Sequence, residues 1–201
     1  MRVEVVRDAY GLRLDEYVEV CGRIDHTAES ARDLVLTWAR GVSGLVLDVG
    51  CGPGQWTHLL TDHGIDVEGL DPVPGFVDHA RATYPTARYR IGRAEALGFD
   101  DASVGGVLAW YSLIHSDPDE IDPPLAAFAR ATTPGGGLAL GFFTGPRLEA
   151  FDHAVTPGYF WPVDLLAARV EAAGFDVTHS GSRHDAGARP HGEILATRRG
   201  D

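Results

Sequence analysis

Residues 45–54 contain the feature that most constrains the fold: a short, mostly apolar run that leads into three glycines at alternate positions. The run reads Leu-Val-Leu-Asp-Val, and Gly50, Gly52 and Gly54 follow it. Helix-like spacing of apolar residues begins at residue 55, so the stretch predicts a strand, a tight turn and a helix. Glycines suit such a turn because they accept positive φ and let the backbone approach a ligand at the helix N-terminus.

An acidic residue after the next apolar run indicates which ligand the turn serves. Residues 67–70 predict a second parallel strand, and Asp71 follows them directly. A carboxylate at this place can bind a ribose diol, so the two segments predict a nucleoside cofactor. Asp48 narrows the choice, because a carboxylate aimed into the turn would repel a pyrophosphate and attract an ammonium or sulfonium. The sequence therefore favours S-adenosylmethionine over NAD.

These motifs resemble those of the class I S-adenosylmethionine-dependent methyltransferases. Residues 48–54 resemble the first motif of that family, residues 69–71 resemble its second-strand acid, and Pro-Gly-Gly-Gly at 134–137 resembles a turn that commonly precedes its fifth strand. The resemblance is strong over residues 45–143 and loose at both ends. It implies transfer of a methyl group from S-adenosylmethionine to an oxygen, nitrogen or carbon of a small-molecule acceptor.

Strand-like and helix-like segments alternate with short links, which is typical of a doubly wound parallel sheet. We predict a single α/β domain over residues 1–201, with a mostly parallel seven-stranded sheet, helices on both faces and an antiparallel C-terminal strand pair. Residues 1–43 would be a lid and helical arm, irregular at its start, 44–145 the cofactor-binding core, and 146–201 the acceptor-side helix and closing strands. Residues 146–161 and 181–192 are expected to be loops.

The candidate cofactor site follows from the rule that ligands of open parallel sheets bind beyond the carboxyl ends of the strands. The family often has Gly-Asp-Ala after its third strand, whereas this chain has Gly92-Arg93-Ala94, so it stays open whether Glu95 contacts the adenine instead. Trp110 would offer an aromatic face to the sulfonium, with core packing as the alternative. The predicted cofactor-binding residues are Asp48, Gly50, Gly52, Gly54, Asp71, Pro72, Arg93, Ala94, Glu95, Ala109 and Trp110.

His115 is the candidate catalytic residue, because it closely follows the fourth strand, whose end passes beneath the reacting methyl in the family that the chain resembles. A phenol acceptor with a pKa near 10 is about 4 kcal/mol short of ionisation at pH 7, and an imidazole base would relieve much of that. With a carboxylate or thiolate acceptor, His115 would only shape the pocket. The predicted acceptor-binding residues, which core packing explains almost as well, are Tyr10, Tyr111, Phe143, His153, Tyr159 and Trp161.

Composition excludes several classes of partner. The net charge of -12 argues against nucleic acid, and all 17 basic residues are arginine, so no lysine can form a Schiff base or complete a phosphate-binding P-loop. The first residues are too charged for a signal peptide, no apolar run is long enough to span a membrane, and the two cysteines fit a reduced compartment. We therefore predict a cytoplasmic protein with no membrane contact, and a homodimer stays open.

Two further patterns receive a structural interpretation. Asp-Pro-Pro-Leu at residues 122–125 is similar to a motif of base-modifying methyltransferases, but it lies well past the fourth strand and predicts a helix N-terminus. His179, His184 and His191, with Asp185 and Glu193, match no metal-ligand spacing, so we predict a solvated loop and no metal site.

The functional alternatives are an NAD-dependent oxidoreductase and a non-catalytic cofactor-binding module.

Overall fold

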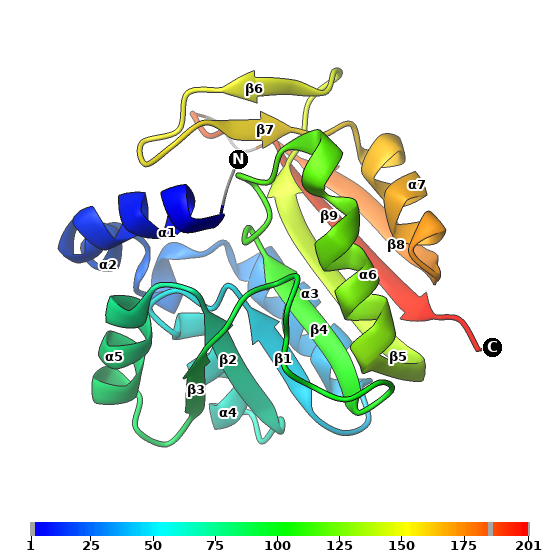
Figure 1. The fold of residues 1–201 in the computed structure, drawn as a ribbon, viewed down its shortest axis with the longest axis horizontal. Helices are drawn as coiled ribbons and strands as arrows, with labels where there is room; N and C mark the ends of the chain where they lie inside the picture. Colours follow the sequence, from blue (N-terminus) through cyan, green and yellow to red (C-terminus); the bar gives the residue numbers. More distant parts are fainter. Residues whose placement is uncertain (1–2, 185–186, 201) are drawn as a thin grey trace.

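A computed structural model of the chain describes residues 3–184 and 187–200. Within these residues, seven strands form one sheet in the order β3-β2-β1-β4-β5-β9-β8, and a separate two-stranded sheet, β6-β7, lies beyond one end of it (Figure 1). The strands are β1 (Val46–Val49), β2 (Val67–Asp71), β3 (Arg88–Ile91), β4 (Val104–Trp110), β5 (Thr132–Phe143), β6 (Glu149–Phe151), β7 (Gly158–Phe160), β8 (Phe175–Arg183) and β9 (His191–Arg198).

The pairing confirms the predicted fold class. Strands β1 to β5 pair in parallel, and β9 runs antiparallel to both of its neighbours, β5 and β8. The chain crosses from β1 to β2 in one direction and from β3 to β4 in the other, so the order of the strands reverses between β1 and β4. In open α/β sheets this reversal opens a crevice at the carboxyl ends of the strands, where ligands bind.

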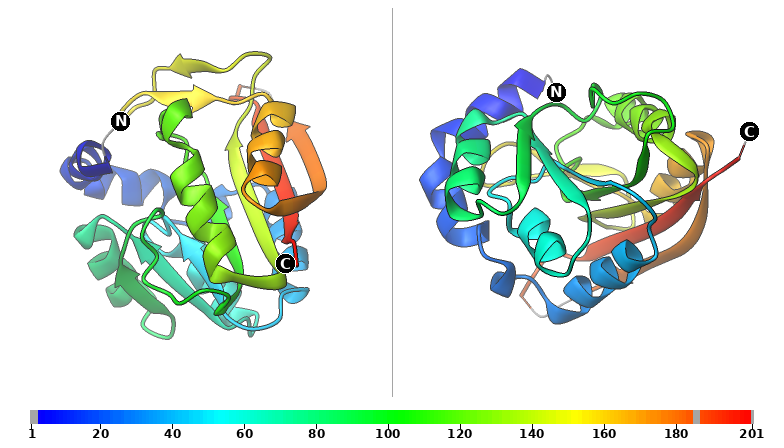
Figure 2. Two further views of the ribbon diagram at one scale, coloured as in Figure 1. Left: turned by 45° about the vertical axis from the view of Figure 1, so that its right-hand side comes forward. Right: turned by 90° about the horizontal axis from the view of Figure 1, so that it is seen from below.

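Helices cover both faces of the sheet (Figure 2). Helices α3 and α4 pack on one face and α6 and α7 on the other, and each face has its own hydrophobic core. The helices are α1 (Val3–Leu12), α2 (Leu14–Cys21), α3 (Glu29–Arg40), α4 (Gln55–Asp62), α5 (Pro74–Thr83), α6 (Asp122–Ala131) and α7 (Val163–Ala172), with short 3-10 turns η1 (Ile24–His26) and η2 (Pro118–Glu120).

The alternation of side chains along the central strands explains how both faces are filled. In β4, Val107 and Ala109 pack toward α6 and α7, whereas Leu108 and Trp110 pack toward α3 and α4. Successive residues of a strand point to opposite faces, and a strand buried on both faces is apolar throughout. Every residue of β4 is buried accordingly.

The N-terminal arm differs from the prediction of an irregular start. Residues 3–21 form two consecutive helices, α1 and α2, because Val6 and Tyr10 lie one helical turn apart and face the cavity described below. Tyr17 of α2 packs against Tyr10 and Phe76 with ring centroids 5.1 and 5.2 Å apart. Both helices are short, with 10 and 8 residues, and charged residues interrupt their apolar positions.

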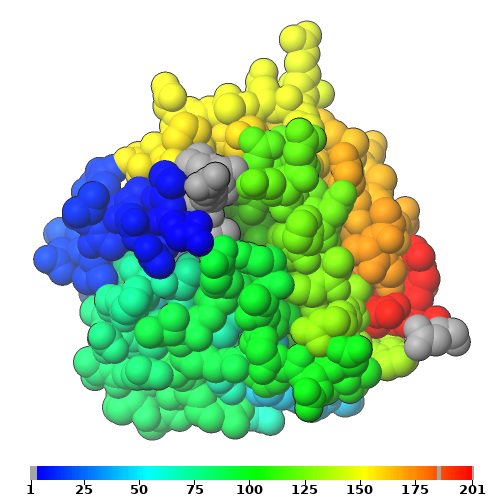
Figure 3. All heavy atoms as spheres, in the orientation of Figure 1, coloured from blue at the N-terminus to red at the C-terminus, as the bar shows by residue number. Residues whose placement is uncertain are grey.

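The segment after β5 also differs from the prediction. Residues 149–160 contain the β6-β7 hairpin instead of a loop. Strand β5 begins at Thr132, so Pro134 to Gly137 lie within it, with Gly135 at a φ of +79°. Strand β8 ends at Arg183 and β9 begins at His191, so both strands are longer than predicted and the loop between them is shorter. In the space-filling view, the helices α1 and α2 and this hairpin meet over one end of the molecule (Figure 3). Among the helices of the described ranges, none is long and apolar enough to cross a bilayer.

Candidate active site

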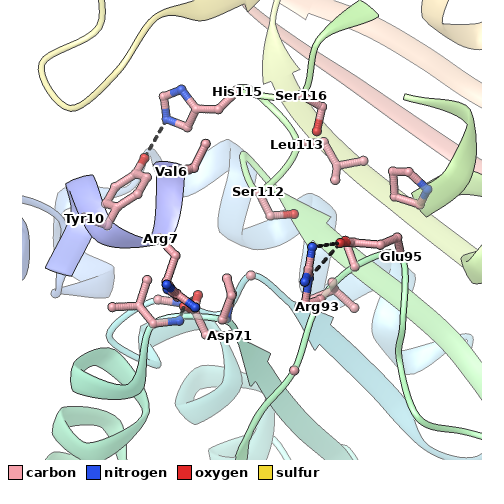
Figure 4. Close-up of a pocket in the computed structure, with 18 of the residues that line it drawn as sticks. Val6, Arg7, Tyr10, Asp71, Arg93, Glu95, Ser112, Leu113, His115 and Ser116 are labelled. Carbon is pink, nitrogen blue, oxygen red and sulfur yellow. Dashed lines mark hydrogen bonds and ion pairs between the residues drawn. The ribbon is translucent and has the colours of Figure 1, made fainter. Parts of the chain in front are cut away.

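A cavity of about 400 Å³ opens at the carboxyl ends of β1, β2 and β4, beneath helix α1 (Figure 4). It lies where the strand order reverses, as the sequence predicts for a ligand site. Most of the predicted site residues meet there, although they come from five separate segments of the chain. Those that line the cavity are Tyr10, Gly50, Gly52, Asp71, Pro72, Arg93, Ala94, Glu95, Trp110, Tyr111 and His115.

The glycine turn has the backbone conformation for which glycine is suited. Gly50, Gly52 and Gly54 have φ values of +75°, +53° and +92°. A Cβ on Gly50 would lie 2.2 Å from Cβ of Ser112, so the β1 turn and the segment after β4 pack without space for a side chain. Gly54 does not line the cavity, because it lies behind the turn, where Tyr89 packs against it.

Asp71 closes one side of the cavity with both of its oxygens fixed. Oδ2 accepts a hydrogen bond from the backbone N–H of Gly52 at 2.9 Å, and Oδ1 accepts one from Val73 at 2.8 Å. Burial raises the pKa of Asp71 to about 6, against the lowering effect of these two bonds. A carboxylate has about four acceptor sites, so the remaining lone pairs can receive two hydroxyl groups of a ligand.

Asp48, predicted to face the cofactor, does not line the cavity. In β1 its side chain alternates with those of Leu47 and Val49 and points toward α4, where Thr57 Oγ1 donates a hydrogen bond of 2.6 Å to Asp48 Oδ2. Burial raises the pKa of Asp48 to about 7, with a smaller contribution from the charge of Asp71. The sequence argument assumed that this carboxylate faces the glycine turn and repels a pyrophosphate there. The side chain faces α4 instead, so that argument against NAD does not hold.

The segment after β3 links the cavity to the N-terminal arm. Arg93, which replaces the acid common in the family, forms ion pairs with Glu95 at 2.6 Å and with Glu4 of helix α1 at 3.2 Å. Figure 4 shows the Arg93–Glu95 pair on the far side of the cavity from Tyr10. Arg93 therefore connects the candidate adenine side of the site with α1, a contact that sequence reasoning missed.

At the end of β4, Trp110 lines the cavity and the predicted Ala109 does not. Ala109 points to the opposite face of the sheet, into the core beneath α6 and α7. The indole of Trp110 lies against Gly141 and packs edge-on against Trp56 with centroids 5.6 Å apart. Among the described residues, neither Nε1 of Trp110 nor the buried Oγ of the cavity residue Ser112 has a hydrogen-bond partner.

His115 is buried, and its two hydrogen bonds define its tautomer. Nδ1 lies 2.9 Å from the carbonyl oxygen of Pro157, which can only accept, so Nδ1 carries the proton. Nε2 is then the acceptor in the 2.8 Å bond with the hydroxyl of Tyr10 (Figure 4). Burial lowers the pKa of His115, which keeps the imidazole neutral. The basic nitrogen of His115 therefore points toward the cavity, with the Tyr10 hydroxyl against it.

Tyr111 has a strained backbone at the centre of the site. Its φ is +62°, which is uncommon for a residue other than glycine, and such strain is found where surrounding contacts enforce it. Its N–H donates to Gly141 at 2.8 Å, and its hydroxyl lies 2.7 Å from Nδ1 of His191. His191 lies in β9 and not in a solvated loop, so that expectation is wrong for this residue, while Asp185 lies outside the described residues. The alternation of small or apolar residues with polar ones from residue 191 onward is the sequence signal that could have placed His191 in a strand.

Four predicted acceptor residues lie outside the cavity lining. Trp161 is 2% exposed and packs in the core, and Tyr159 turns toward Asp117, whose Oδ2 lies 3.3 Å from its hydroxyl. For these two, core and surface packing explain the side chains. Phe143 and His153 lie one ring away from the cavity, because Phe143 contacts Tyr111 at 5.1 Å and His153 contacts His115 at 4.9 Å between ring centroids.

The Asp-Pro-Pro-Leu segment begins helix α6, which confirms its interpretation as a helix N-terminus. Asp122 forms an ion pair with Arg169 at 2.9 Å, so it points away from the cavity. Pro123 and Pro124 nevertheless line the cavity, as do Tyr17 and Arg7. Sequence reasoning considers Tyr17 as a contact of the arm beside Tyr10, and it missed the two prolines and Arg7. Among residues 3–184 and 187–200, no three histidine, cysteine or acidic side chains gather closely enough to hold a metal ion.

Comparisons with known proteins find similarity in the overall fold and in the segment that contains the glycine turn and Asp71. A family described as a methyltransferase domain matches residues 46–136. An uncharacterized methyltransferase of Mycobacterium tuberculosis is 39% identical over 95 residues, which are 47% of this chain and 38% of the relative. A malonyl-[acyl-carrier protein] O-methyltransferase of Erwinia billingiae is 31% identical over 137 residues, covering 68% of this chain and 52% of the relative. The chain thus spans between about two fifths and half of the length of these curated relatives.

A solved structure extends the similarity to almost the whole chain. The crystal structure of a 1,6-didemethyltoxoflavin-N1-methyltransferase of Burkholderia thailandensis superposes with a TM-score of 0.81, covering 98% of this chain and 88% of that one, at 21% sequence identity. At this identity the likeness supports the fold, while the family match covers the glycine turn, Asp71 and the end of β4. The sheet order, the cavity at the strand reversal and the match over residues 46–136 make the chain similar to the class I S-adenosylmethionine-dependent methyltransferases.

Proposed function

We propose that the protein transfers a methyl group from S-adenosylmethionine to an oxygen, nitrogen or carbon of a small-molecule acceptor. The observation that carries this proposal is that one cavity holds two separate chemical functions. Asp71 lies on one side of it with free acceptor capacity for a ribose, and His115 lies on another side with a neutral imidazole whose lone pair points inward. A binding site for a nucleoside alone would not need the second group.

The residues of the cavity fit an S-adenosylmethionine molecule. Asp71 would bind the ribose, residues 93–95 would lie along the adenine, and Trp110 would present its aromatic ring to the sulfonium, an attraction of about 0.5–2 kcal/mol. The unpartnered Oγ of Ser112 beside Gly50 is a polar atom that such a ligand would satisfy. When bound, this cofactor supplies an electrophilic methyl group on a positively charged sulfur.

His115 would accept the proton that a hydroxyl or amine acceptor loses. The hydroxyl of Tyr10 donates to Nε2 of His115 and both residues line the cavity, so this hydroxyl can pass its own proton to Nε2 while it takes the proton of the acceptor. Burial raises the pKa of Tyr10 well above the usual value, which keeps the phenol protonated between turnovers. For a phenol acceptor, ionisation at pH 7 costs about 4 kcal/mol, and removal of the proton during the transfer would relieve much of this cost.

Helices α1 and α2 would act as a lid over the cofactor. Both Glu4 and Tyr10 of α1 contact residues on the opposite wall of the cavity, namely Arg93 and His115. Closure would exclude water and align the acceptor with the reacting methyl, which supplies most of the acceleration in reactions of this type. We also propose that residues 1–201 act as one domain and that the protein is cytoplasmic, because both cysteines are free thiols.

The relatives support a small-molecule acceptor without identifying it. One is a malonyl-[acyl-carrier protein] O-methyltransferase, and the similar solved structure is an N1-methyltransferase of 1,6-didemethyltoxoflavin. These two act on different atoms of unrelated molecules. We therefore propose only the shared reaction, and the net charge of -12 continues to disfavour nucleic acid as the acceptor.

Calorimetric titration with S-adenosylhomocysteine and, separately, with NAD tests the cofactor. We expect binding of the first and none of the second, and the reverse result would favour an oxidoreductase. Incubation with isotope-labelled S-adenosylmethionine and a panel of phenols, amines and carboxylic acids tests the reaction. His115→Gln should reduce methylation of phenols by about 10²–10⁴-fold and leave S-adenosylhomocysteine affinity within about twofold. Equal activity of the variant would refute the base, and an inactive wild type would favour a non-catalytic binding module.

A further inference from the structure

Arg189 stacks on two aromatic rings outside the cavity lining and forms no ion pair with a carboxylate among the described residues. Its guanidinium carbon is 4.8 Å from the centroid of the Phe151 ring and 5.8 Å from that of Phe143. Nη2 donates a 2.9 Å hydrogen bond to the backbone oxygen of Asp152. A guanidinium has five N–H donors in a planar fork, so most of its hydrogen-bonding capacity is available to a ligand.

Two lines of ring contacts connect this guanidinium with the cavity. Phe143 packs against Tyr111 with centroids 5.1 Å apart, and Tyr111 lines the cavity. On the other side, Phe151 contacts His153 at 6.2 Å, and His153 contacts His115, also a cavity residue, at 4.9 Å. A flat molecule with its reacting atom near His115 would meet aromatic side chains as it extends outward, and these rings lead to the cation.

Two arginines lie close enough to His153 in this hairpin to affect its titration. The pKa of His153 is lowered to about 4, chiefly by burial and then by the nearby His115, Arg189 and Arg13. Arg13 forms an ion pair with Glu16 at 2.6 Å, so its charge is largely offset. Arg189, by contrast, forms no ion pair with another described residue. Since the net charge of the chain is -12, most of its surface repels anions, and an arginine without an ion pair is a place where an anionic ligand can bind.

We propose that Arg189 binds a carboxylate at the outer end of the methyl acceptor, whose body is planar and apolar and whose reacting atom lies near Tyr111 and His115. This inference rests on the proposed function, because it places the acceptor in the same cavity. The guanidinium fork matches the two oxygens of a carboxylate, and the faces of Phe143 and Phe151 hold that fork in place. The methyl group would go to the inner atom and not to the carboxylate.

Matched probe pairs test the charge preference without knowledge of the natural acceptor. The probes are 4-hydroxybenzoate, 4-hydroxyphenylacetate and 4-hydroxycinnamate, each beside its neutral primary amide of nearly equal shape. Their affinities are measured by calorimetry with and without saturating S-adenosylhomocysteine. We expect at least one carboxylate to bind about tenfold more tightly than its amide, as a charge-assisted hydrogen bond would give. Equal affinities within all three pairs, or no binding of any probe at several millimolar, would overturn the proposal.

Substitutions of Arg189 test whether this residue causes the preference for a carboxylate over its amide. Arg189→Gln should reduce the carboxylate-to-amide ratio to about one, whereas Arg189→Lys, which keeps the charge and loses the fork, should retain part of it. Arg147→Gln is the matched control, since Arg147 is an exposed arginine after β5 whose loss changes the net charge equally. A preference that survives in Arg189→Gln, or is lost equally in Arg147→Gln, would refute the assignment. Failure to bind S-adenosylhomocysteine would count against the proposed function alone, because the comparison without it still measures the anion preference.

Discussion

Replacing Asp48 by asparagine should change how the stability of the protein depends on pH. The carboxyl group of Asp48 is 2% exposed and receives a hydrogen bond from Thr57, and burial raises its pKa from an ordinary 3.8 to about 7. An asparagine keeps an oxygen that Thr57 can donate to, but it does not titrate. The variant therefore removes a proton equilibrium and changes the shape of the site very little.

The sign follows from comparing the two states of the chain. In the unfolded state Asp48 loses its proton near pH 4, whereas in the folded state it keeps it until about pH 7. The folded state thus binds more protons between these values, so the contribution of Asp48 to stability is fully present below about pH 4 and is lost as the pH rises through 7. Linkage at these pKa values gives a loss of about 3 kcal/mol between about pH 5 and pH 8.

Urea denaturation of the wild type and of Asp48→Asn across this pH range measures the effect. The stability of the variant relative to the wild type should rise by about 3 kcal/mol from about pH 5 to pH 8. Asp78→Asn is the control, because the Asp78 side chain is 76% exposed. If the difference between variant and wild type stayed constant with pH, Asp48 would be ionised in the folded protein and would face either solvent or a cation, contrary to the buried geometry described above.

Two further substitutions test the turn and the centre of the site. Gly50→Ala should cost about 2–4 kcal/mol and abolish S-adenosylhomocysteine binding, because its Cβ would lie 2.2 Å from Ser112. Gly64→Ala, with a φ of +76° and no atom within 4 Å, should cost only the backbone strain of about 1–2 kcal/mol, and equal effects in thermal unfolding would contradict the steric argument. His191→Ala should lower the melting temperature by a few degrees and methylation by about tenfold, with cofactor affinity kept, because the bond to the Tyr111 hydroxyl is lost. The control His179→Ala, which replaces an exposed histidine of β8, should match the wild type. A normal methylation rate in His191→Ala would refute the role of His191 in positioning Tyr111.

The glycine turn and the acid that line the cavity could be predicted from the sequence because their determinants are local. The spacing of Gly50 and Gly52, the position of Asp71 and the alternation of strands and helices all lie within short stretches, and each is tied to a backbone requirement. The position of His115 at the cavity could be predicted for the same reason, since it closely follows the strand whose carboxyl end opens into the cavity, and its catalytic role stays a prediction.

The direction of the Asp48 side chain was predicted wrongly, although the alternation of β1 contains the answer. Val46 and Asp48 share the face that packs on α4, and Leu47 and Val49 share the other, so Asp48 meets Thr57 and not the cavity. The helical form of the arm was missed for a different reason. Its contact residues, such as Tyr10, gain their role only from tertiary contacts with a site more than a hundred residues away.

The acceptor end of the site is built mainly by segments that lie outside the family match. That match covers residues 46–136, whereas Tyr10, His153, Arg189 and His191 come from the arm, the hairpin and the strand pair that lie before or after it. Each of these segments is attached to the edge or the top of the sheet, so its side chains can change without disturbing the cofactor turn. A relative that overlaps chiefly in the core thus shares the donor and need not share the acceptor. Because Arg189 lies outside the family match, the proposed carboxylate preference would belong to this chain, and its own binding measurements, not the names of relatives, decide its substrate.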